Sequence, residues 1–342
     1  MTLFAQPLTP SPQIPMILVT GGAGFIGSNL VAALDARGER VAVCDWLGTD
    51  DKWRNLAKRE LEMIVAPEQL SGFLDDHGGD IEIIFHMGAI SSTTEPDADL
   101  IIDTNFRLSR MLWLWCKDND VRLVYASSAA TYGDGTAGFK DDESLEGLAK
   151  LHPLNAYGWS KHLFDRWNIR QKSRGGPGPT QNVGLKFFNV YGPNEYHKGS
   201  MRSVVEQVFP FAQRDEPFAL FKSHNPNYKD GGQLRDFIWV GDVVNVMLWL
   251  LDHPKINGLY NLGTGKARSF ADLAAAVYQA AGKTPMITYR DMPEQLREKY
   301  QYFTEADMNK LCAAGYTAPF TSLEEGVRQY VQNYLATPDR YV

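Results

Sequence analysis

Short runs of apolar residues recur along the first half of the chain, and each run ends at or beside a glycine or a polar side chain. The runs cover residues 16–20, 41–45, 81–89, 121–126 and 183–191. Apolar runs of this length without alternation are typical of parallel strands that are buried on both faces. Between them apolar residues return at intervals of three and four, as in Ile26, Leu30 and Leu34, which predicts helices. The alternation predicts an α/β fold with a doubly wound parallel sheet covered by helices on both faces.

The regular alternation stops near residue 190. Polar, irregular stretches and short strand-like runs follow, at 194–200, 221–232, 234–240 and 259–262. Helix start signals come later, at Ser269, Thr304 and Ser322. We therefore expect a second, smaller layer that is irregular and rich in helices.

Composition excludes several classes of protein. Of the 342 residues, 44% are hydrophobic and 22% charged, as in ordinary globular proteins, so we expect one or two domains. The formal net charge of −7 and the lack of a basic block argue against a nucleic-acid partner. Cys44, Cys116 and Cys312 form no C-x-x-C pair, which argues against a disulfide framework and a zinc site. A reducing compartment and no bound metal are expected.

The first fifteen residues contain four prolines and neither lysine nor arginine. They lack the basic start and the long apolar core of a signal peptide, and no apolar run is long enough to span a membrane. We expect a flexible leader over residues 1–15, a fold that begins at Met16, and a cytoplasmic protein without membrane association.

A glycine cluster follows the first predicted strand. Gly21, Gly24 and Gly27 are spaced G-x-x-G-x-x-G at the start of a predicted helix. Glycines in this context allow a tight turn and the close approach of a dinucleotide pyrophosphate, whose charge meets the helix N-terminus. The alternative is a purely structural glycine turn.

An acid closes the second predicted strand. Asp45 lies about 20 residues beyond the glycines, where a carboxylate that binds the adenosine ribose is expected, and this favours NAD over NADP. Cations that could meet a 2′-phosphate follow at Lys52, Arg54, Lys58 and Arg59. A solvated helix face explains most of them equally well, so the residues alone leave the choice of cofactor open.

Candidate catalytic residues follow the fourth strand. Ser127 and Ser128 stand at its end, where doubly wound sheets place ligands, although they could simply cap a turn. Tyr157 and Lys161 are four residues apart on a predicted helix, so they project from one face. A nearby ammonium favours the phenolate and lowers the tyrosine pKa, as a proton-abstracting tyrosine requires. The alternative is an ordinary amphipathic helix with a solvated lysine.

The order of these four features resembles the extended short-chain dehydrogenase/reductase family of nucleotide-sugar enzymes, from Met16 onward. The resemblance implies a Rossmann-like fold. It also implies that Tyr157 is the acid/base and that Lys161 binds the nicotinamide ribose and lowers the tyrosine pKa. Ser128 would hydrogen-bond the reacting oxygen, with Ser127 as the near alternative for that role.

Longer stretches narrow the resemblance to members that epimerise an ADP-linked heptose. They are TGGAGFIGSN, GAISSTTE, YASSAATYG, PLNAYGWSK, FFNVYGPNEYHKGSM, RDFIWVGDV, YNLGTG and YQYFT. HKGSM discriminates best, since it implies a second acid/base, Lys198, on the opposite face of the sugar. On its own, Lys198 would be interpreted as an exposed loop lysine.

The activity implied is epimerisation at C6″ of ADP-D-glycero-β-D-manno-heptose to its L-glycero epimer, in the pathway that supplies heptose for lipopolysaccharide core. The resemblance implies transient hydride transfer to a tightly bound nicotinamide cofactor through a 6″-aldehyde. It further implies NADP as the cofactor, an ADP-sugar as the substrate and a homo-oligomer.

The resemblance also assigns binding residues and domains. The cofactor would be held by Gly21, Gly24, Phe25, Ile26, Gly27, Asp45, Lys52, Met87, Gly88, Ala89, Ser91, Asn105, Tyr157, Lys161, Val190 and Lys198. The ADP-sugar would be held by Ser128, Asn189, Ser200, Phe221, Lys222, Ser223, His224, Arg235 and Tyr300. The chemistry of Arg235 supports this assignment independently, because a guanidinium can clamp a pyrophosphate. A surface ion pair with Asp236 or Asp242 would also explain Arg235.

The dinucleotide-binding domain would comprise 16–186 and 233–262, and the substrate domain 187–232 and 263–342.

The chain departs from the family pattern in several places. Trp46 replaces the usual asparagine after the acid, and Pro67 stands where a lysine near the 2′-phosphate is expected. Both substitutions keep NAD open as the cofactor. Gln207 replaces a substrate-contacting histidine, and the loop 221–234 is longer than the family pattern.

Three other hypotheses remain. A UDP-hexose 4-epimerase on the same scaffold would give Lys198 no role. A 4,6-dehydratase would need an acid pair after the serine, where this chain has Ala129 and Ala130. A non-catalytic nicotinamide-dinucleotide-binding protein would not need Tyr157, Lys161 and a serine together.

Overall fold

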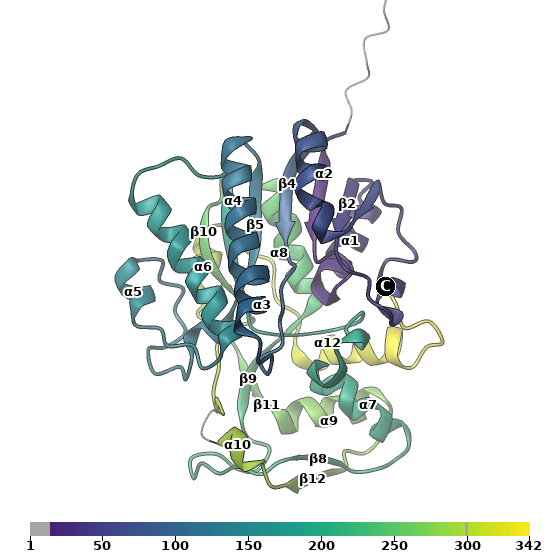
Figure 1. Ribbon diagram of the computed structural model, residues 1–342. Helices are drawn as coiled ribbons and strands as arrows, with labels where there is room; N and C mark the ends of the chain where they lie inside the picture. Colours follow the sequence, from purple (N-terminus) through teal and green to yellow (C-terminus); the bar gives the residue numbers. More distant parts are fainter. Residues whose placement is uncertain (1–13, 298–299) are drawn as a thin grey trace, which may run out of the picture.

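The computed structural model describes residues 14–297 and 300–342. A sheet of seven parallel strands forms its centre, in the order β10-β6-β5-β4-β1-β2-β3 (Figure 1). The strands are β1 (Met16–Thr20), β2 (Arg40–Cys44), β3 (Met63–Val65), β4 (Ile81–His86), β5 (Arg122–Ser128), β6 (Asn182–Phe187) and β10 (Gly258–Leu262). The predicted doubly wound parallel sheet is confirmed. The strand order reverses between β1 and β4, and such a switch point is where doubly wound sheets bind ligands.

Helices cover both faces of this sheet because successive strand residues point to opposite sides. Ile17 and Val19 of β1 belong to the core beneath α1 (Phe25–Ala36) and α8 (Val240–Asp252). Met16 and Leu18 belong to the core beneath three helices on the other face. These are α2 (Leu70–His77), α4 (Leu108–Asp118) and α6 (Ala156–Ser173). Residues buried on both faces explain why the strands show no polar alternation.

A second layer lies below the large sheet in the view of Figure 1. Its strands form a three-stranded sheet, β11-β9-β7, and a two-stranded sheet, β12-β8. They are β7 (Asn189–Tyr191), β8 (Phe218–Phe221), β9 (Leu234–Trp239), β11 (Ala267–Ser269) and β12 (Ile287–Arg290). The helices are α7 (Val204–Gln213), α9 (Phe270–Ala280) and α12 (Leu323–Tyr330), which share a third hydrophobic core.

Shorter helical segments complete the chain. They are α3 (Ala98–Ile102), α5 (Leu145–Ala149), α10 (Glu294–Arg297), α11 (Asn309–Ala313), the 3-10 segments η1 (Asp51–Asn55), η2 (Pro67–Gln69), η3 (Gly78–Asp80), η5 (Ala129–Tyr132) and η6 (Tyr196–Met201), and the π-helical segments η4 (Asp103–Arg107) and η7 (Val331–Leu335). No helix among the described residues is long and apolar enough to cross a membrane.

Two local predictions are wrong. The run 183–191 is not one strand, since Phe188 donates its N–H to Leu262 O at 3.0 Å and the chain then leaves β6 to form β7 in the smaller sheet. The helix expected at Thr304 begins instead at Asn309, and Thr304 Oγ1 accepts a hydrogen bond from the N–H of Asp236.

Because β9 joins the small sheet and β10 the large one, 233–262 contributes to both layers. The expected division into two domains stays a prediction, and the expected leader lies mostly outside the described residues.

Candidate active site

The glycine turn lies at the switch point of the large sheet. Gly21 has a φ of +67°, and a Cβ on it would lie 2.5 Å from Gly88 N. A Cβ on Gly27 would lie 2.1 Å from Gly21 O, and Gly24 is the N-cap of α1 and places no side chain over the helix end. The first turn of α1 carries no acid. These features form a cradle at a helix N-terminus, which fits the pyrophosphate of a dinucleotide.

A buried network holds the loop that follows β4, which carries Met87, Gly88, Ala89 and Ser91. Asn105 accepts a hydrogen bond from Ile90 N at 2.8 Å and donates to Ile90 O at 2.9 Å and to Ser160 Oγ at 3.0 Å. Its side chain is completely buried. Asn105, expected to contact the cofactor, therefore positions this loop.

His86, at the end of β4, also fixes this edge of the sheet. Its ring nitrogens lie 2.6 Å from Thr20 Oγ1 and 2.8 Å from Ser109 Oγ. Burial lowers the pKa of His86 to about 3, and the charge of Lys161 adds to this effect. The imidazole is therefore neutral at physiological pH.

The expected ribose end is lined by charged groups that already have partners. Asp45 accepts hydrogen bonds from Ala23 N at 3.0 Å and Lys52 Nζ at 2.8 Å, and Lys52 also donates to Trp46 O at 2.7 Å. The indole of Trp46 is 48% exposed and donates to Glu68 Oε1 at 2.7 Å.

The other nearby cations are paired as well. Arg54 binds Asp51 at 3.1 Å. Lys58 and Arg59 bind carbonyl oxygens of residues 341 and 342. Two carboxylates, Asp45 and Glu68, thus stand at this end, and Lys52 is already paired with one of them.

Tyr157, Lys161 and Ser128 are brought together by close packing of α6 against η5. A Cβ on Gly158 would lie 2.7 Å from Ala130 O, so the helix approaches as only glycine allows. Asn155 caps the helix by accepting a hydrogen bond from Gly158 N at 2.8 Å. Burial raises the pKa of Tyr157, and a hydrogen bond with Ser128 opposes this shift.

Lys161 is one helical turn further on, with only 3% of its side chain exposed. Burial lowers its pKa to about 8, against the charge of Asp165, which raises it. Within the described residues its ammonium has no hydrogen-bond partner. A buried, unpaired ammonium beside the switch point fits a lysine that would hold a ribose hydroxyl.

The two serines at the end of β5 have different surroundings. Ser127 donates to Asp165 Oδ2 at 2.7 Å, and Lys186 donates to the same oxygen at 2.8 Å and to Thr131 Oγ1 at 2.7 Å. Asp165 and Lys186 are completely buried. Ser127 therefore belongs to a structural network, and Ser128 is the serine beside Tyr157.

Lys198 lies in η6, which follows β7. Its ammonium is 5.2 Å from the ring centre of Phe25, the first residue of α1. Burial lowers the pKa of Lys198, and the neighbouring charge of Glu195 raises it. Lys198 is thus a half-buried cation beside the glycine turn and not a solvated loop lysine. Nearby, Ser200 and Asn189 are exposed and Val190 is half-buried.

Arg235 is buried in the second layer, with 8% of the residue exposed. Its guanidinium lies 5.6 Å from the ring centre of Phe270 and 5.2 Å from that of Tyr300, and it donates to Leu234 O at 2.8 Å. The surface ion pair is not observed, because the carboxylates of Asp236 and Asp242 bind other groups.

The remaining expected substrate residues end or follow β8. Arg290 lies over the Phe221 ring at 5.0 Å, and Lys222 lies 3.3 Å from Asp291. Ser223 donates to Asn225 O at 2.7 Å, while the N–H of His224 donates to Tyr302. Gln207 donates to Arg202 O at 2.7 Å, so its amide is engaged within its own segment.

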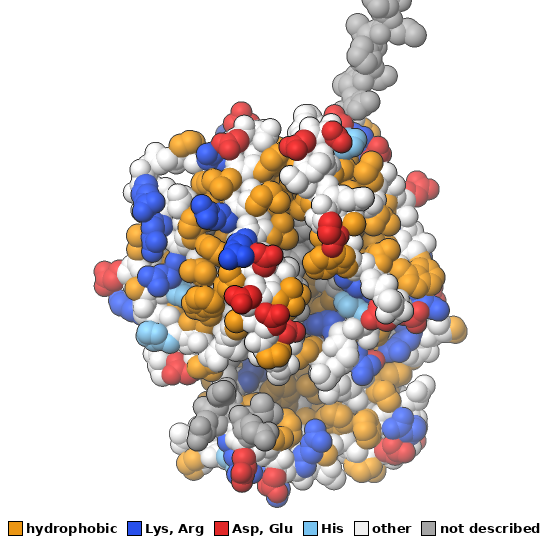
Figure 2. All heavy atoms as spheres, viewed as in Figure 1, with side chains coloured by type: hydrophobic (Ala, Val, Ile, Leu, Met, Phe, Trp, Pro, Cys, Tyr) orange, Lys and Arg blue, Asp and Glu red, His pale blue; other side chains and the backbone are white. Residues whose placement is uncertain are grey.

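Figure 2 shows this face of the molecule hollowed between the two layers, with lysine or arginine side chains inside the hollow.

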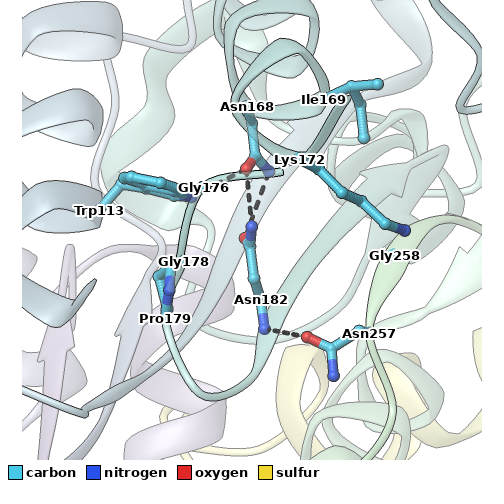
Figure 3. Close-up of a pocket in the computed structure, with 10 residues that line it drawn as sticks. All are labelled: Trp113, Asn168, Ile169, Lys172, Gly176, Gly178, Pro179, Asn182, Asn257 and Gly258. Carbon is cyan, nitrogen blue, oxygen red and sulfur yellow. Dashed lines mark hydrogen bonds between the residues drawn. The ribbon is translucent and has the colours of Figure 1, made fainter. Parts of the chain in front are cut away.

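A separate cavity opens at the opposite edge of the large sheet, beside the first residues of β6 and β10 (Figure 3). Trp113, Asn168, Asn182 and Asn257 line it and are joined by hydrogen bonds. Its volume of about 190 Å³ is below the roughly 300–1,000 Å³ typical of small-molecule sites. No group of side chains suited to a metal occurs in the described part of the chain.

Sequence reasoning missed His86, Asp165 and Lys186. Asp165 stands four residues after Lys161 and eight after Tyr157, so its position on the same helix face was a usable signal. His86 and Lys186 lie within apolar runs, where a buried polar partner can be recognised only once the neighbouring strands are known.

Comparisons with known proteins agree with this geometry. A model of the NAD dependent epimerase/dehydratase family matches residues 17–263. The ADP-L-glycero-D-manno-heptose-6-epimerase of Nitratidesulfovibrio vulgaris is 49% identical over 330 residues, which cover 96% of this chain and 100% of the relative. The protein of that name from Fusobacterium nucleatum is 48% identical over 336 residues, with the same coverage.

Solved structures show the same similarity. ADP-L-glycero-D-manno-heptose-6-epimerase of Helicobacter pylori is 27% identical with a TM-score of 0.74, covering 93% of this chain and 96% of that chain. The Thermus thermophilus UDP-glucose 4-epimerase complex with NAD is 29% identical with a TM-score of 0.71, covering 92% and 97%.

Proposed function

Because this chain belongs to the NAD-dependent epimerase/dehydratase family, we propose that it converts ADP-D-glycero-β-D-manno-heptose to ADP-L-glycero-β-D-manno-heptose by inverting C6″. The chain is an epimerase, hence an isomerase, and its cofactor is a nicotinamide dinucleotide. The observation that carries the choice of substrate is the half-buried Lys198 beside the glycine turn. A second titratable group there suits a reaction that needs an acid/base on each face of the sugar.

Ser128, Tyr157 and Lys161 would each have a separate role in this reaction. C6″ is an unactivated carbinol carbon, so its C–H bond cannot be broken by simple proton removal. When bound, the nicotinamide supplies the acceptor and then the donor of a hydride. Ser128 would hydrogen-bond the 6″-oxygen, Tyr157 would take the hydroxyl proton, and Lys161 would stabilise the phenolate.

The sugar would pass through a 6″-aldehyde that turns about its C5″–C6″ bond. The oxygen then lies on the other side, while Tyr157 and the cofactor stay in place. Lys198 would donate its own proton to the oxygen in this second orientation, and proton exchange with solvent would restore Tyr157 and Lys198 before the next turnover. Since burial lowers its pKa, Lys198 can exchange a proton more readily than an exposed lysine.

For the cofactor we propose NAD, although family resemblance alone implied NADP. A 2′-phosphate would meet the carboxylates of Asp45 and Glu68, and the indole N–H of Trp46 holds Glu68 in place. Lys52 is paired with Asp45, and Pro67 supplies no cation. Identifying the nucleotide released on denaturation tests this: NAD is expected, and NADP would contradict it.

The same proposal includes a tightly retained cofactor, a homo-oligomer and a cytoplasmic role in supplying heptose for lipopolysaccharide core. The retained cofactor, the homo-oligomer and the pathway rest on the family resemblance, and the cytoplasmic location rests on the composition and cysteine pattern of the chain. Arg235 and the residues that end or follow β8 would hold the ADP moiety.

The direct test is incubation of the purified protein with the D-glycero substrate, followed by NMR. The L-glycero epimer is expected, and its absence would contradict the proposal. UDP-glucose, tested in parallel, should give no UDP-galactose, whereas turnover there would favour a 4-epimerase.

Substitutions test the two proposed bases. Tyr157→Phe should lower turnover at least ~10²-fold with substrate binding largely intact. A comparable loss in Lys198→Met would support two bases, whereas near-normal turnover in that variant would leave only one.

A further inference from the structure

Residues 339–342, here called the tail segment, lie between two loops of the site. Figure 1 shows the end of the chain beside the loop that follows β2. On that side Lys58 Nζ lies 2.7 Å from Asp339 Oδ2 and donates to Tyr341 O at 2.7 Å. Arg59 donates to Val342 O at 3.3 Å. Lys58 and Arg59 lie three and four residues beyond the end of η1, whose Lys52 binds Asp45 at the expected ribose end.

On its other side the tail segment binds the residues that precede Lys198. Tyr196 donates its hydroxyl to Arg340 O at 2.7 Å, and the Arg340 guanidinium lies 4.3 Å from the centre of the Tyr196 ring. The ring of Tyr341 meets the same ring edge-on, with 5.3 Å between centroids. The N–H of Val342 donates to Asn194 Oδ1 at 3.2 Å. Tyr196 is therefore packed from two directions by the tail segment.

The two loops also bind each other directly. Asn55, at the end of η1, donates to Ala23 O in the glycine turn at 2.9 Å and to Asn194 O at 3.1 Å. Below Lys198, the carboxylate of Glu195 binds Ser203 N at 2.5 Å and Ser203 Oγ at 2.6 Å. The segment 194–203 is thus closed internally by Glu195 and Ser203 and is held from outside by Asn55 and by the tail segment.

The tail segment therefore contacts both loops. We propose that Arg340 and Tyr341 are positioning residues, which hold Tyr196 so that Lys198 keeps its place beside the cofactor cradle. This inference rests on the proposed function. Catalysis is sensitive to displacements of about 1 Å, so a loosened Tyr196 would reduce the step that uses Lys198. The same contacts link the placement of Lys198 to the loop that holds the ribose.

Alanine substitutions of these two residues test the proposal by kinetics. Tyr341→Ala and Arg340→Ala should lower kcat about tenfold with KM changed by less than about twofold. Tyr341→Phe is the matched control and should behave as wild type, because the Tyr341 hydroxyl has no hydrogen-bond partner in the described ranges. Loss of activity in Tyr341→Phe would contradict the packing argument.

A double-mutant cycle separates positioning from general destabilisation. If the tail segment acts through Lys198, Tyr341→Ala combined with Lys198→Met should be no slower than Lys198→Met alone. Multiplied losses would overturn the proposal.

Hydrogen exchange of residues 194–203 provides a readout that needs no substrate. Exchange there should be faster in Tyr341→Ala and Arg340→Ala than in wild type, while α4 exchanges as before. Unchanged exchange at 194–203 would overturn the proposal even if the wild type is active. A wild type inactive on the ADP-heptose would instead contradict the proposed function and leave the exchange result to decide the role of the tail segment.

Discussion

The ammonium of Lys161 is buried among groups that act on its proton in opposite directions. Burial opposes a positive charge on Lys161, whereas the nearby carboxylate of Asp165 favours it. The resulting pKa of about 8 leaves Lys161 charged near neutrality but close to its titration. A residue that must be charged to stabilise a phenolate is therefore sensitive to mildly alkaline pH.

This predicts that kcat/KM falls as pH rises above about 8, since deprotonated Lys161 cannot stabilise the Tyr157 phenolate. The stability of the folded protein should not fall over the same pH range. The folded-state pKa lies below the ordinary value of 10.5, so between these values the unfolded chain holds the extra proton and stability rises with pH. Kinetics and urea unfolding from pH 7 to 9.5 would check both statements. Lys161→Arg keeps its charge and should lack the alkaline decline, so the same decline in that variant would assign it to another group.

Much of the candidate site could be predicted from residue spacing. Tyr157, Lys161 and the glycines belong to short local patterns whose geometry follows from one helix or one turn. The choice between Ser127 and Ser128 could not be predicted, because it depends on Asp165 and Lys186 from other elements. The positioning role of Asn105 was missed for the same reason, since Ile90 and Ser160 meet it only in the folded chain.

The turn between β1 and α1 is built around contacts that exclude a side chain. Gly21 has a φ of +67°, and Gly27 presses α1 against the turn. The N-terminus of α1 can approach a pyrophosphate only while these contacts persist.

Gly27→Ala should therefore weaken cofactor binding at least about tenfold, because its Cβ would lie 2.1 Å from Gly21 O and α1 must move away. The nucleotide retained on purification and the affinity for added NAD would measure the loss. Gly72→Ala in α2 is the control, because a Cβ there meets no heavy atom within 4 Å. That variant should keep full affinity and gain up to about 1 kcal/mol of stability. Normal nucleotide retention in Gly27→Ala would contradict the assignment of the turn.

Most strands of the large sheet were predictable because each is a mainly apolar run, whereas the three-residue β3 was not predicted. The second layer was harder. Nothing in the run 183–191 marks Phe188 as the residue where the chain changes sheets, since that depends on Leu262 from a distant strand. Thr304 has the side chain of a helix cap, yet it binds the backbone of Asp236 instead. Tertiary hydrogen bonds overrode local signals in both cases.

Across the whole molecule, three histidines are held in surroundings that disfavour their charged form. Burial lowers the pKa of His86 to about 3, and those of His162 and His197 to about 4. Each folded-state value lies below the ordinary 6.5, so the unfolded chain takes up protons first as pH falls through 6.5.

The free energy of unfolding should accordingly fall by up to about 4 kcal/mol between pH 7.5 and pH 5.5, roughly 1.4 kcal/mol for each histidine, and by less where solvent screens His162 and His197. Urea unfolding at several pH values would measure this change. Replacement of the exposed His152 by Gln should leave the slope unaltered, whereas His162→Gln should reduce it. The raised pKa values of buried carboxyls such as Asp141, Asp242 and Glu195 act in the opposite direction. A flat profile from pH 7.5 to 5.5 would contradict the expectation.

The small sheet β7-β9-β11 also has a mechanical consequence. Each of its strands carries the chain between the two layers, and β9 and β11 lie between them in Figure 1. Because these strands are hydrogen-bonded side by side, they form a ribbon. Such a ribbon resists the sliding of one strand past another, but it can bend out of its own plane. The small sheet is thus a hinge between the two layers. Opening the hollow to admit a sugar nucleotide would be a rotation about this sheet. Closing the hollow would return Arg235 and the glycine turn to the same relative position each time.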